Sequence, residues 1–402
     1  MHIFIAIHYL EIGGAEISLI GLLQAIDYSQ HDVDLFVYSH RGELMQHIPK
    51  EVHLLPEIPA YAHIERPMKE ALKNGHFGIV AGRLVAKLRH KLYKRRKNPI
   101  DNAAVLHYIF SSVEPFLPRI NPTVEYDMAI SFLMPHNIVL NKVRAKKKVC
   151  WIHTDYTHID VNAPLELPTW SRYDHIVSIS PDVTRTFLQV FPTLKDKIVE
   201  IENILSPTFV RRRADEIPED VIRQEMPREE GVINLLSVGR FSYPKNYDNV
   251  PMICKQINDN VPVKIKWFLI GFGGDEALIR RKIAEAGMED HVIILGKKSN
   301  PYPYIKACDI YVQPSRYEGK SVTVREAQML CKPVIVTDYP TASSQVRHGQ
   351  DGIIVPLDNT ECAHAISQFI QNQALQDEIT AYLNTHDYGN TKEVEKVYEL
   401  QR

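Results

Sequence analysis

The sequence has few cysteines and almost no net charge. Its five cysteines are spread along 402 residues, with no close pair at metal-ligand spacing. This usage argues against a disulfide framework and favours buried free thiols in a reducing compartment. The formal net charge of −2 and a pI near 6.8 give no general reason to expect a nucleic-acid partner.

Long apolar runs are also missing. None approaches the ~18 residues that a membrane-spanning helix needs. The chain starts with the strand-like pattern MHIFIAI and no basic leader, so we expect no signal peptide. Together these features predict a cytoplasmic protein, with at most a peripheral position on a membrane.

Short apolar segments alternate with helical patterns along the whole chain, which is typical of parallel sheets covered by helices on both faces. We therefore predict an α/β protein with two doubly wound domains, residues 1–205 and 232–387. A polar, proline-dotted crossing is expected at 206–231. Such sheets bind ligands at the carboxyl ends of their strands, so a cleft between two facing edges is expected. The predicted strands are 3–7, 34–38, 52–56, 127–133, 147–152, 175–180, 197–203, 232–239, 264–271, 292–296, 309–312, 333–338 and 352–356.

One stretch, PSRYEGKSVTVREAQM at residues 314–329, combines several features of a ligand site. A strand ends before it, and a helix is predicted from about Ser321, which is a suitable N-cap. Gly319 lets backbone approach a ligand closely. The first free N–H groups of the helix, with its dipole, favour an anion such as a phosphate. Glu318 precedes this helix and Glu326 lies inside it.

A second group follows the first strand of the C-terminal half. Arg240 and Lys245 are cations predicted at a carboxyl edge, where a guanidinium fork and a lysine charge suit a diphosphate. Fixed cations can stabilise the charge that develops on a departing phosphate, and can do so in place of a metal. Glycine turns near Gly13 and Gly271 are weaker signals, because such turns occur in many α/β domains.

The order of these motifs resembles the retaining glycosyltransferases of family 4. The resemblance rests on G-R-F with Lys245-Asn246, on P-S-x-x-E-G with Glu326-Ala327 seven residues further on, and on the P-V-I-V strand at 333–336. It implies the GT-B fold, with two Rossmann-like domains facing across a cleft and a final helix, 388–402, packed back on the first domain. It also implies a nucleotide-sugar donor.

The resemblance assigns roles to individual residues. Arg240, Lys245, Glu318 and His153 would be catalytic, with Glu318 beside the transferred sugar. Glu326 would bind the ribose hydroxyls, and backbone N–H groups near Ser321 the distal phosphate. The other donor-binding residues would be Gly13, Gly14, Asn203, Gly271, Gly296, Lys297, Gly319, Lys320 and Val322.

The expected activity is transfer of a hexose or N-acetylhexosamine from a nucleotide-diphosphate sugar, with UDP as the expected nucleotide, to a saccharide or lipid-linked saccharide. No metal or other cofactor is expected, and the products would be surface polysaccharide or glycolipid. A nucleotide-sugar epimerase and a non-catalytic nucleotide-sugar-binding module remain alternatives. The sequence departs from the family at Lys320-Ser321 and at 337–345, which leaves donor contacts there open.

A basic segment at residues 82–97 carries eight lysines or arginines and no acid. Leu84, Leu88 and Leu92 fall on one helical stripe, with Val85 beside it. This stripe either docks on its own domain or, together with the basic charge, forms a seat on an anionic membrane or a lipid-phosphate acceptor. No motif for reading DNA accompanies it.

Overall fold

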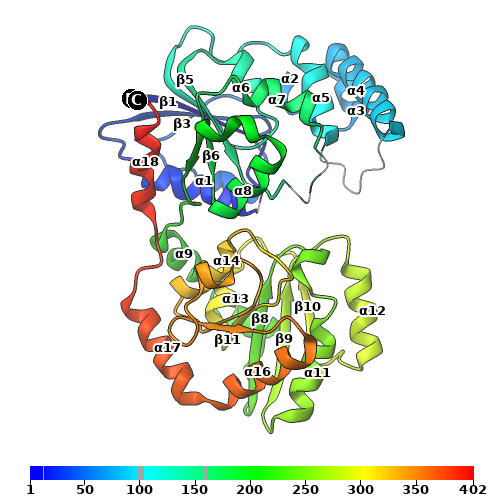
Figure 1. Cartoon of the computed structure of the whole chain (residues 1–402), viewed down its shortest axis with the longest axis vertical. Coiled ribbons are helices and arrows are strands. Elements are labelled where there is room, and N and C mark those ends of the chain that lie inside the picture. Colours follow the sequence, from blue (N-terminus) through cyan, green and yellow to red (C-terminus); the bar gives the residue numbers. More distant parts are fainter. Residues whose placement is uncertain (12, 97–103, 157–158, 160) are drawn as a thin grey trace. The chain divides into compact units, whose positions relative to one another are not determined.

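The chain forms two compact units in this computed structural model, which describes all residues except 12, 97–103, 157–158 and 160, and the side chains of 94–96. The N-terminal unit contains Met1–Leu205 together with Asn390–Arg402, and the C-terminal unit contains Ser206–Gly389. Each unit is built around one parallel sheet (Figure 1).

The N-terminal unit has a seven-stranded sheet in the order β3-β2-β1-β4-β5-β6-β7, and every pair of neighbours is parallel. The chain passes from β1 to β2 on one side and reaches β4 on the other. The carboxyl ends of β1 and β4 therefore flank the point where the strand order reverses, which is where such sheets bind ligands. The strands are β1 (His2–Ile7), β2 (Asp32–Val37), β3 (His53–Leu54), β4 (Tyr126–Ser131), β5 (Ala145–Ile152), β6 (His175–Ser178) and β7 (Ile198–Glu200).

Helices cover this sheet, and four of them lie in the long connection between β3 and β4. Residues 3–7 of β1 are fully buried, as expected for a continuous apolar strand between two helical layers. The helices are α1 (Gly14–Ala25), α2 (Pro59–Ala62), α3 (Met68–Lys73), α4 (Phe77–Arg96), α5 (Ala104–Val113), α6 (Asn137–Lys142), α7 (Ala163–Trp170), α8 (Pro181–Val190) and α18 (Val394–Glu399).

The C-terminal unit has a six-stranded parallel sheet in the order β10-β9-β8-β11-β12-β13. The strands are β8 (Val232–Val238), β9 (Lys264–Ile270), β10 (Val292–Gly296), β11 (Ile310–Gln313), β12 (Val334–Thr337) and β13 (Ile353–Val355). The helices are α9 (Pro207–Ala214), α10 (Glu219–Glu225), α11 (Val250–Asn260), α12 (Glu276–Ala286), α13 (Tyr302–Ala307), α14 (Val322–Met329), α15 (Ala342–Gln345), α16 (Asn359–Gln371) and α17 (Gln373–Thr385).

The predicted fold class is confirmed, and each expected strand is present within a few residues of its predicted bounds. Residues 206–231, expected as a crossing, form α9 and α10, which contact α13 and α14 in the C-terminal unit. The end of the chain contacts the N-terminal unit from Asn390 onward. There the hydroxyl of Tyr398 accepts a hydrogen bond from the N–H of Asp27 at 2.9 Å.

Helix α4 contains most of the basic segment, whose last residue, 97, lies outside the described residues. Its apolar stripe faces outward: Leu84, Leu88 and Leu92 are 54%, 61% and 50% exposed. On the buried side, Gly82 and Ala86 permit close packing against α5, since a Cβ on Gly82 would lie 2.7 Å from the carbonyl oxygen of Ser112. The alternative that the stripe docks on its own domain is therefore wrong.

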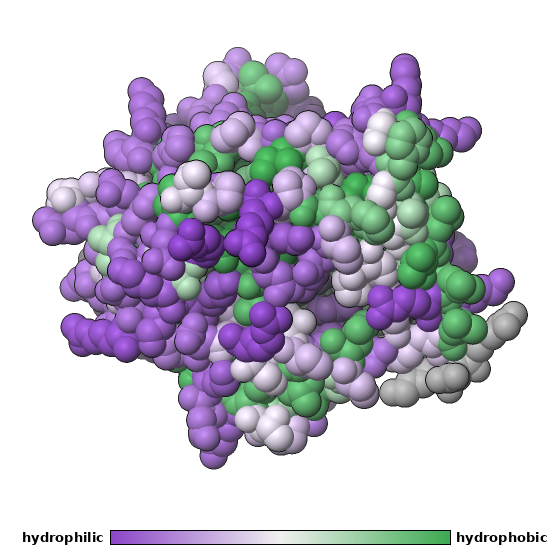
Figure 2. Space-filling model, turned by 90° about the horizontal axis from the view of Figure 1, so that it is seen from above, coloured by the Kyte–Doolittle hydropathy of each residue, from purple (hydrophilic) through white to green (hydrophobic). Residues whose placement is uncertain are grey.

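Figure 2 shows hydrophobic surface along the right margin of its view, the side on which Figure 1 draws α4. The exposed Lys87 and Lys91 flank the leucine stripe on the helix surface. Among the described residues, none of the helices has both the length and the apolar character that a membrane crossing requires. The five cysteines are free thiols, buried except for Cys331, which is half-buried.

Candidate functional site in the C-terminal unit

Lys245 and Glu318 meet at the carboxyl edge of the C-terminal sheet. The ammonium nitrogen of Lys245 lies 2.5 Å from Oε1 of Glu318, and both side chains are mostly buried. The stem of Lys245 passes over Gly239, where a Cβ would lie 3.2 Å from Cε of the lysine. A glycine at the end of β8 therefore leaves room for the lysine to reach the acid.

Two further donors hold the same carboxylate oxygen. Gln313, at the end of β11, donates from Nε2 at 3.0 Å, and Ser315 donates from its hydroxyl at 2.6 Å. All three bonds converge on Oε1, and within the described parts of the chain Oε2 of Glu318 accepts none. The carboxylate is thus fixed in direction while one oxygen is left for a ligand.

Arg316 joins the two loops that carry this pair. Its guanidinium makes a two-fold contact with Asp248, at 2.9 and 2.8 Å, and lies 4.2 Å over the ring of Tyr243. Its backbone N–H donates to the carbonyl of Pro244 at 2.8 Å. A planar fork matches a carboxylate in one orientation only, so this clamp sets where Lys245 lies relative to Glu318. Our sequence analysis missed it, because nothing in the spacing of Asp248 and Arg316 indicates a contact.

The start of α14 differs from the prediction in one respect. Ser321 is the N-cap residue, but its hydroxyl does not cap the helix and lies 3.1 Å from the hydroxyl of Thr323. Its backbone N–H, expected to face a phosphate, donates to Oε1 of Gln345 at 3.1 Å. The amide of Gln345 also donates to the carbonyl of Ser321. A side chain from α15 therefore occupies one of the expected anion donors. Val322 is the first residue of α14.

Glu326 is fully buried in α14, with 0% exposure. Its Oε1 accepts a hydrogen bond from the hydroxyl of Tyr302 at 2.6 Å, while Oε2 has no hydrogen-bond partner. Burial raises the pKa of Glu326 to about 7, and the bond from Tyr302 opposes that rise. A buried carboxylate oxygen without a donor is costly, which makes it a candidate for a ligand hydroxyl.

Three glycines lie side by side where β8, β9 and β10 end. Gly271 has a φ of +155°, and a Cβ there would lie 1.9 Å from the carbonyl oxygen of Gly239. Its N–H donates to the carbonyl of Gly296 at 3.0 Å, and Gly296 has a φ of +73°. Close packing between neighbouring loops thus explains Gly271 without any ligand. The ammonium of Lys297 lies 5.4 Å from the ring centre of Phe272 in the same loop.

Arg240 is exposed beside this glycine edge. Its guanidinium makes no ion pair or hydrogen bond with any residue that the structure describes. Gly319 and Lys320 are half-buried in the segment between Glu318 and α14. The C-terminal unit therefore gathers Arg240, Lys245, Glu318 and the start of α14 on one edge of one sheet.

Gly13 and Gly14 lie in the N-terminal unit, where α1 begins. Gly13 is the N-cap residue in extended conformation, and a Cβ there would lie 2.2 Å from the carboxylate of Glu16. The side chain of this acid folds back over the glycine. A carboxylate of the protein itself therefore covers the helix start that was expected to face the donor phosphates.

His153 and Asn203 lie close together in the same unit. Neither ring nitrogen of His153 has a partner in hydrogen-bonding geometry, and Oδ1 of Asn203 has none either. Burial lowers the pKa of His153 to about 4, while the backbone of Phe132 and the side chain of Asn203 act in the opposite direction. The imidazole is therefore neutral at physiological pH. It can exchange hydrogen bonds with a ligand but does not act as a fixed cation.

Comparison with known proteins gives a family match in the C-terminal unit. Residues 218–385 match the sequence model of the glycosyl transferases group 1. The chain is 27% identical over 158 residues to the amylovoran biosynthesis glycosyltransferase AmsD of Erwinia amylovora, covering 39% of this chain and 44% of that protein. It is 31% identical over 86 residues to a lipopolysaccharide core biosynthesis mannosyltransferase of Rhizobium meliloti, covering 21% and 24%. The chain thus spans less than half the length of these two relatives.

Among solved structures, that of Anabaena HepE in complex with UDP and glucose superposes with a TM-score of 0.68 at 18% identity. The superposition covers 99% of this chain and 98% of the other. At this identity the likeness concerns the fold, which extends over both units. The C-terminal unit thus resembles the group 1 glycosyl transferases in sequence, and the whole chain has the GT-B fold of glycosyltransferases.

Proposed function

We propose that the protein is a glycosyltransferase that moves a sugar from a nucleotide-diphosphate sugar, with UDP as the nucleotide, to a saccharide acceptor. The observation that carries the proposal is the contact of Lys245 with Glu318 beside the start of α14. It joins a cation for phosphate and an acid for sugar hydroxyls at a carboxyl edge. The matches to an amylovoran glycosyltransferase and to a structure holding UDP and glucose support it.

The leaving group defines the chemistry that these residues must do. The bond from the anomeric carbon to the β-phosphate oxygen breaks, and its electron pair stays on the phosphate. The acceptor oxygen forms the new bond to the anomeric carbon and passes its proton to a phosphate oxygen on the same face, which retains the configuration. Arg240 and Lys245 stabilise the developing phosphate charge, a task that we assign to them rather than to a metal.

The two glutamates, Glu318 and Glu326, bind different parts of the donor. Oε2 of Glu318, left without a donor, accepts hydrogen bonds from hydroxyls of the transferred hexose or N-acetylhexosamine. Oε2 of Glu326 accepts a hydrogen bond from a ribose hydroxyl. Because Glu326 is fully buried, donor binding has to expose this oxygen. The remaining donor-binding assignments, which include Lys320 and the N-terminal Gly13, Gly14, His153 and Asn203, rest on the family resemblance.

The surface of helix α4 supports the proposal that the protein binds at a membrane surface. Leu84, Leu88 and Leu92 form an exposed apolar stripe, and the exposed Lys87 and Lys91 flank it. A basic amphipathic helix of this kind suits an anionic lipid surface, where apolar side chains enter the interface and lysines bind headgroups. We therefore propose a lipid-linked saccharide acceptor and surface polysaccharide or glycolipid as the product, made at the cytoplasmic face.

The test is a donor panel of UDP-glucose, UDP-galactose and their N-acetylated forms, with and without an added saccharide acceptor, followed by NMR. We expect a new glycosidic linkage that keeps the anomeric configuration of the donor, and unchanged rates in EDTA. Donor converted to another sugar without acceptor would instead indicate an epimerase. Donor binding with neither hydrolysis nor transfer would indicate a binding module.

A further inference from the structure

The carboxylate of Glu326 receives its hydrogen bond from a residue of another helix. Tyr302, at the start of α13, donates from its hydroxyl to Oε1 of Glu326 at 2.6 Å. Tyr302 is 2% exposed, and it belongs to none of the motifs that the sequence singled out. Oε2 of Glu326 is buried and has no hydrogen-bond partner. One oxygen of the acid is therefore fixed by the fold, and the other is left for a ligand.

Tyr302 is itself held by helix α9 and by the turn before α13. Its ring meets the ring of Phe209 edge to face, with the ring centres 6.3 Å apart. Its backbone N–H donates to Oδ1 of Asn300 at 3.3 Å, and Nδ2 of Asn300 donates to the carbonyl of Arg213 at 2.7 Å. A buried ring whose backbone is anchored in this way has little freedom to turn, so the fold sets the direction of its hydroxyl.

The phenol of Tyr302 stays protonated and remains a donor. Burial is the main cause that raises the pKa of Tyr302 well above its usual value, and the charge of Glu326 adds to the rise, while the charge of Arg213 lowers it. Tyr311, a phenol on β11 whose pKa also responds to Glu326, uses its hydroxyl to donate to Gln313 at 2.7 Å. Burial raises the pKa of Glu326, and the bond from Tyr302 opposes this rise. Tyr302 thus favours the ionised acid, which only accepts hydrogen bonds.

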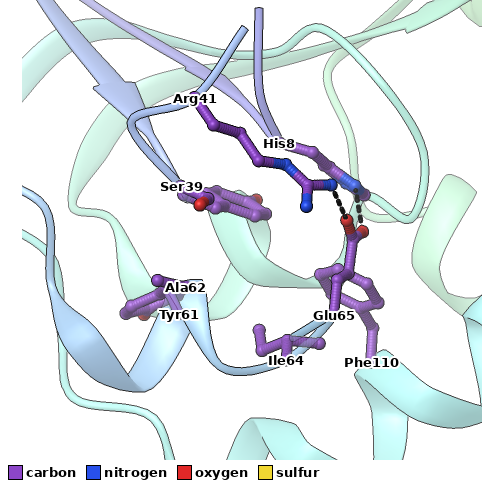
Figure 3. Close-up of a pocket in the computed structure, with 9 residues that line it drawn as sticks. His8, Ser39, Arg41, Tyr61, Ala62, Ile64, Glu65 and Phe110 are labelled. Carbon is purple, nitrogen blue, oxygen red and sulfur yellow. Dashed lines mark hydrogen bonds and ion pairs between the residues drawn. The ribbon is translucent and has the colours of Figure 1, made fainter. Parts of the chain in front are cut away.

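Glu65 in the N-terminal unit is a contrasting case, because both of its carboxylate oxygens have partners. Nδ1 of His8 lies 3.0 Å from Oε1 of Glu65, and Arg41 donates to Oε2 at 3.4 Å (Figure 3). Burial raises the pKa of Glu65, but the bond from His8 and the charges of neighbouring cations outweigh it and lower the pKa. Such an acid is satisfied within the fold, whereas Glu326 keeps a second oxygen for a ligand.

We propose that Tyr302 is a positioning residue for the nucleotide: its hydroxyl holds Oε1 of Glu326, so that Oε2 meets a ribose hydroxyl of the donor. The ribose contact of Glu326 rests on the proposed function. Donor binding exposes Oε2, and the bond from Tyr302 keeps the carboxylate from turning when it does. A site built around a hydroxyl rejects a ligand that lacks it, because the buried acceptor is then left unpaired. Tyr302 therefore contributes to the choice of a ribonucleotide over a deoxyribonucleotide.

The test measures the affinity of the full chain for UDP, 2′-deoxy-UDP and 3′-deoxy-UDP by calorimetry. We expect UDP to bind about tenfold more tightly than at least one of the deoxy forms. Tyr302→Phe keeps the ring and removes the hydroxyl. It should weaken UDP binding about tenfold and leave binding of that deoxy form unchanged, so that the preference is lost. Tyr304→Phe is the matched control and should keep the preference, since Tyr304 lies on the same helix but donates to Glu225 at 2.5 Å.

Two further readouts separate positioning from a loss of structure. In transfer assays Tyr302→Phe should raise KM for the donor and change kcat by less than about twofold, because the reacting groups are untouched. The midpoint of the rise in UDP affinity with pH should move upward, because the bond that opposes the raised pKa of Glu326 is gone. A loosened fold would weaken binding equally at every pH, and the titration of UDP itself is the same for all variants.

Glu326→Asp keeps the charge but draws the carboxylate away from the phenol, so it decides the question if Tyr302→Phe does not fold. Loss of the ribose preference, with Tyr304→Phe unaffected, supports the inference. A preference that survives the change, equal losses in Tyr302→Phe and Tyr304→Phe, or an unchanged protein that binds UDP no better than both deoxy forms would overturn it while transfer from a UDP-sugar stands. Failure of the unchanged protein to bind any UDP-sugar would remove the proposed function itself.

Discussion

Lys245 and Glu318 lie 73 residues apart in the sequence, yet their charged atoms are 2.5 Å apart at the edge of the C-terminal sheet. The ammonium group of Lys245 is paired with this carboxylate oxygen. A diphosphate would compete with Glu318 for the ammonium group of Lys245. Sugar hydroxyls would then replace the lysine at the carboxylate.

This competition predicts that the pair matters to turnover more than to folding. Lys245→Ala should lower kcat for transfer about 100-fold, because it removes a fixed cation from the developing phosphate charge. The midpoint of urea unfolding should shift little. Lys255→Ala removes a lysine that pairs with Asp259 on the surface of α11, and serves as the matched control. Equal rates for the two variants would refute the assignment.

Loosening the contact of Arg316 with Asp248 should misplace Lys245 and Glu318, to which we assign the reaction, without removing either side chain. We predict that Arg316→Lys lowers kcat about tenfold, since a lysine cannot reproduce the two-fold contact or lie flat over Tyr243. Asp248→Asn should have a similar effect, and the double variant should lose little more than either single change. Steady-state kinetics of the four proteins measures this coupling. Fully additive losses would show that the two side chains act independently.

Because Glu326 is buried, we predict that removing its negative charge raises the stability of the protein and lowers its affinity for the donor. Its pKa is about 7 in the fold against an ordinary 4.5, so the folded state holds a proton that the unfolded state has lost between these values. The free energy of unfolding therefore falls as pH rises from about 4.5 to 7, by up to about 3 kcal/mol.

Glu326→Gln removes this ionisation and should raise the melting temperature above pH 7. It should also weaken UDP binding, because an amide offers only one acceptor oxygen to a ribose. Melting curves at pH 5 and 8, with and without UDP, measure both effects. Tighter UDP binding by the variant would contradict the ribose role.

Two buried histidines predict acid sensitivity of the N-terminal unit. Burial is the main cause that lowers the pKa of His136 well below 6.5 and that of His153 to about 4. Below pH 6.5 the unfolded chain takes up protons that the fold excludes, so stability is lost as pH falls towards 4. Each histidine contributes a slope of at most about 1.4 kcal/mol per pH unit. His153→Gln should flatten this dependence in urea titrations, whereas His40→Gln, at an exposed site, should not.

The exposed stripe of α4 predicts binding to anionic vesicles. The protein should sediment with vesicles containing phosphatidylglycerol and not with phosphatidylcholine alone, and salt should weaken the binding. Leu84→Gln with Leu88→Gln should reduce sedimentation severalfold and leave transfer to a soluble acceptor unchanged. Changing Val221→Gln, at another exposed apolar side chain in the C-terminal unit, is the control. Equal binding to both vesicle types would remove the electrostatic part of the proposal.

The sequence by itself determined the architecture. Strands buried on both faces must be continuously apolar, and this pattern located both sheets. It also located the short-range parts of the site, because Glu318, Gly319 and Ser321 owe their places to one strand, one turn and one helix. The sequence also left two alternatives for the apolar stripe of α4, docked on its own domain or exposed. Only the packing of Gly82 and Ala86 on α5 decided between them.

Only the tertiary structure decided which distant side chains meet. Three contacts join segments that are separate in the sequence. They are the hydrogen bond from the N–H of Ser321 to the amide oxygen of Gln345, the Arg316–Asp248 contact and the His8–Glu65 pair. Side chains that are distant in sequence meet only where the sheet order brings their loops together. Local patterns carry no information about such contacts, because each depends on where two independently folded loops end in space.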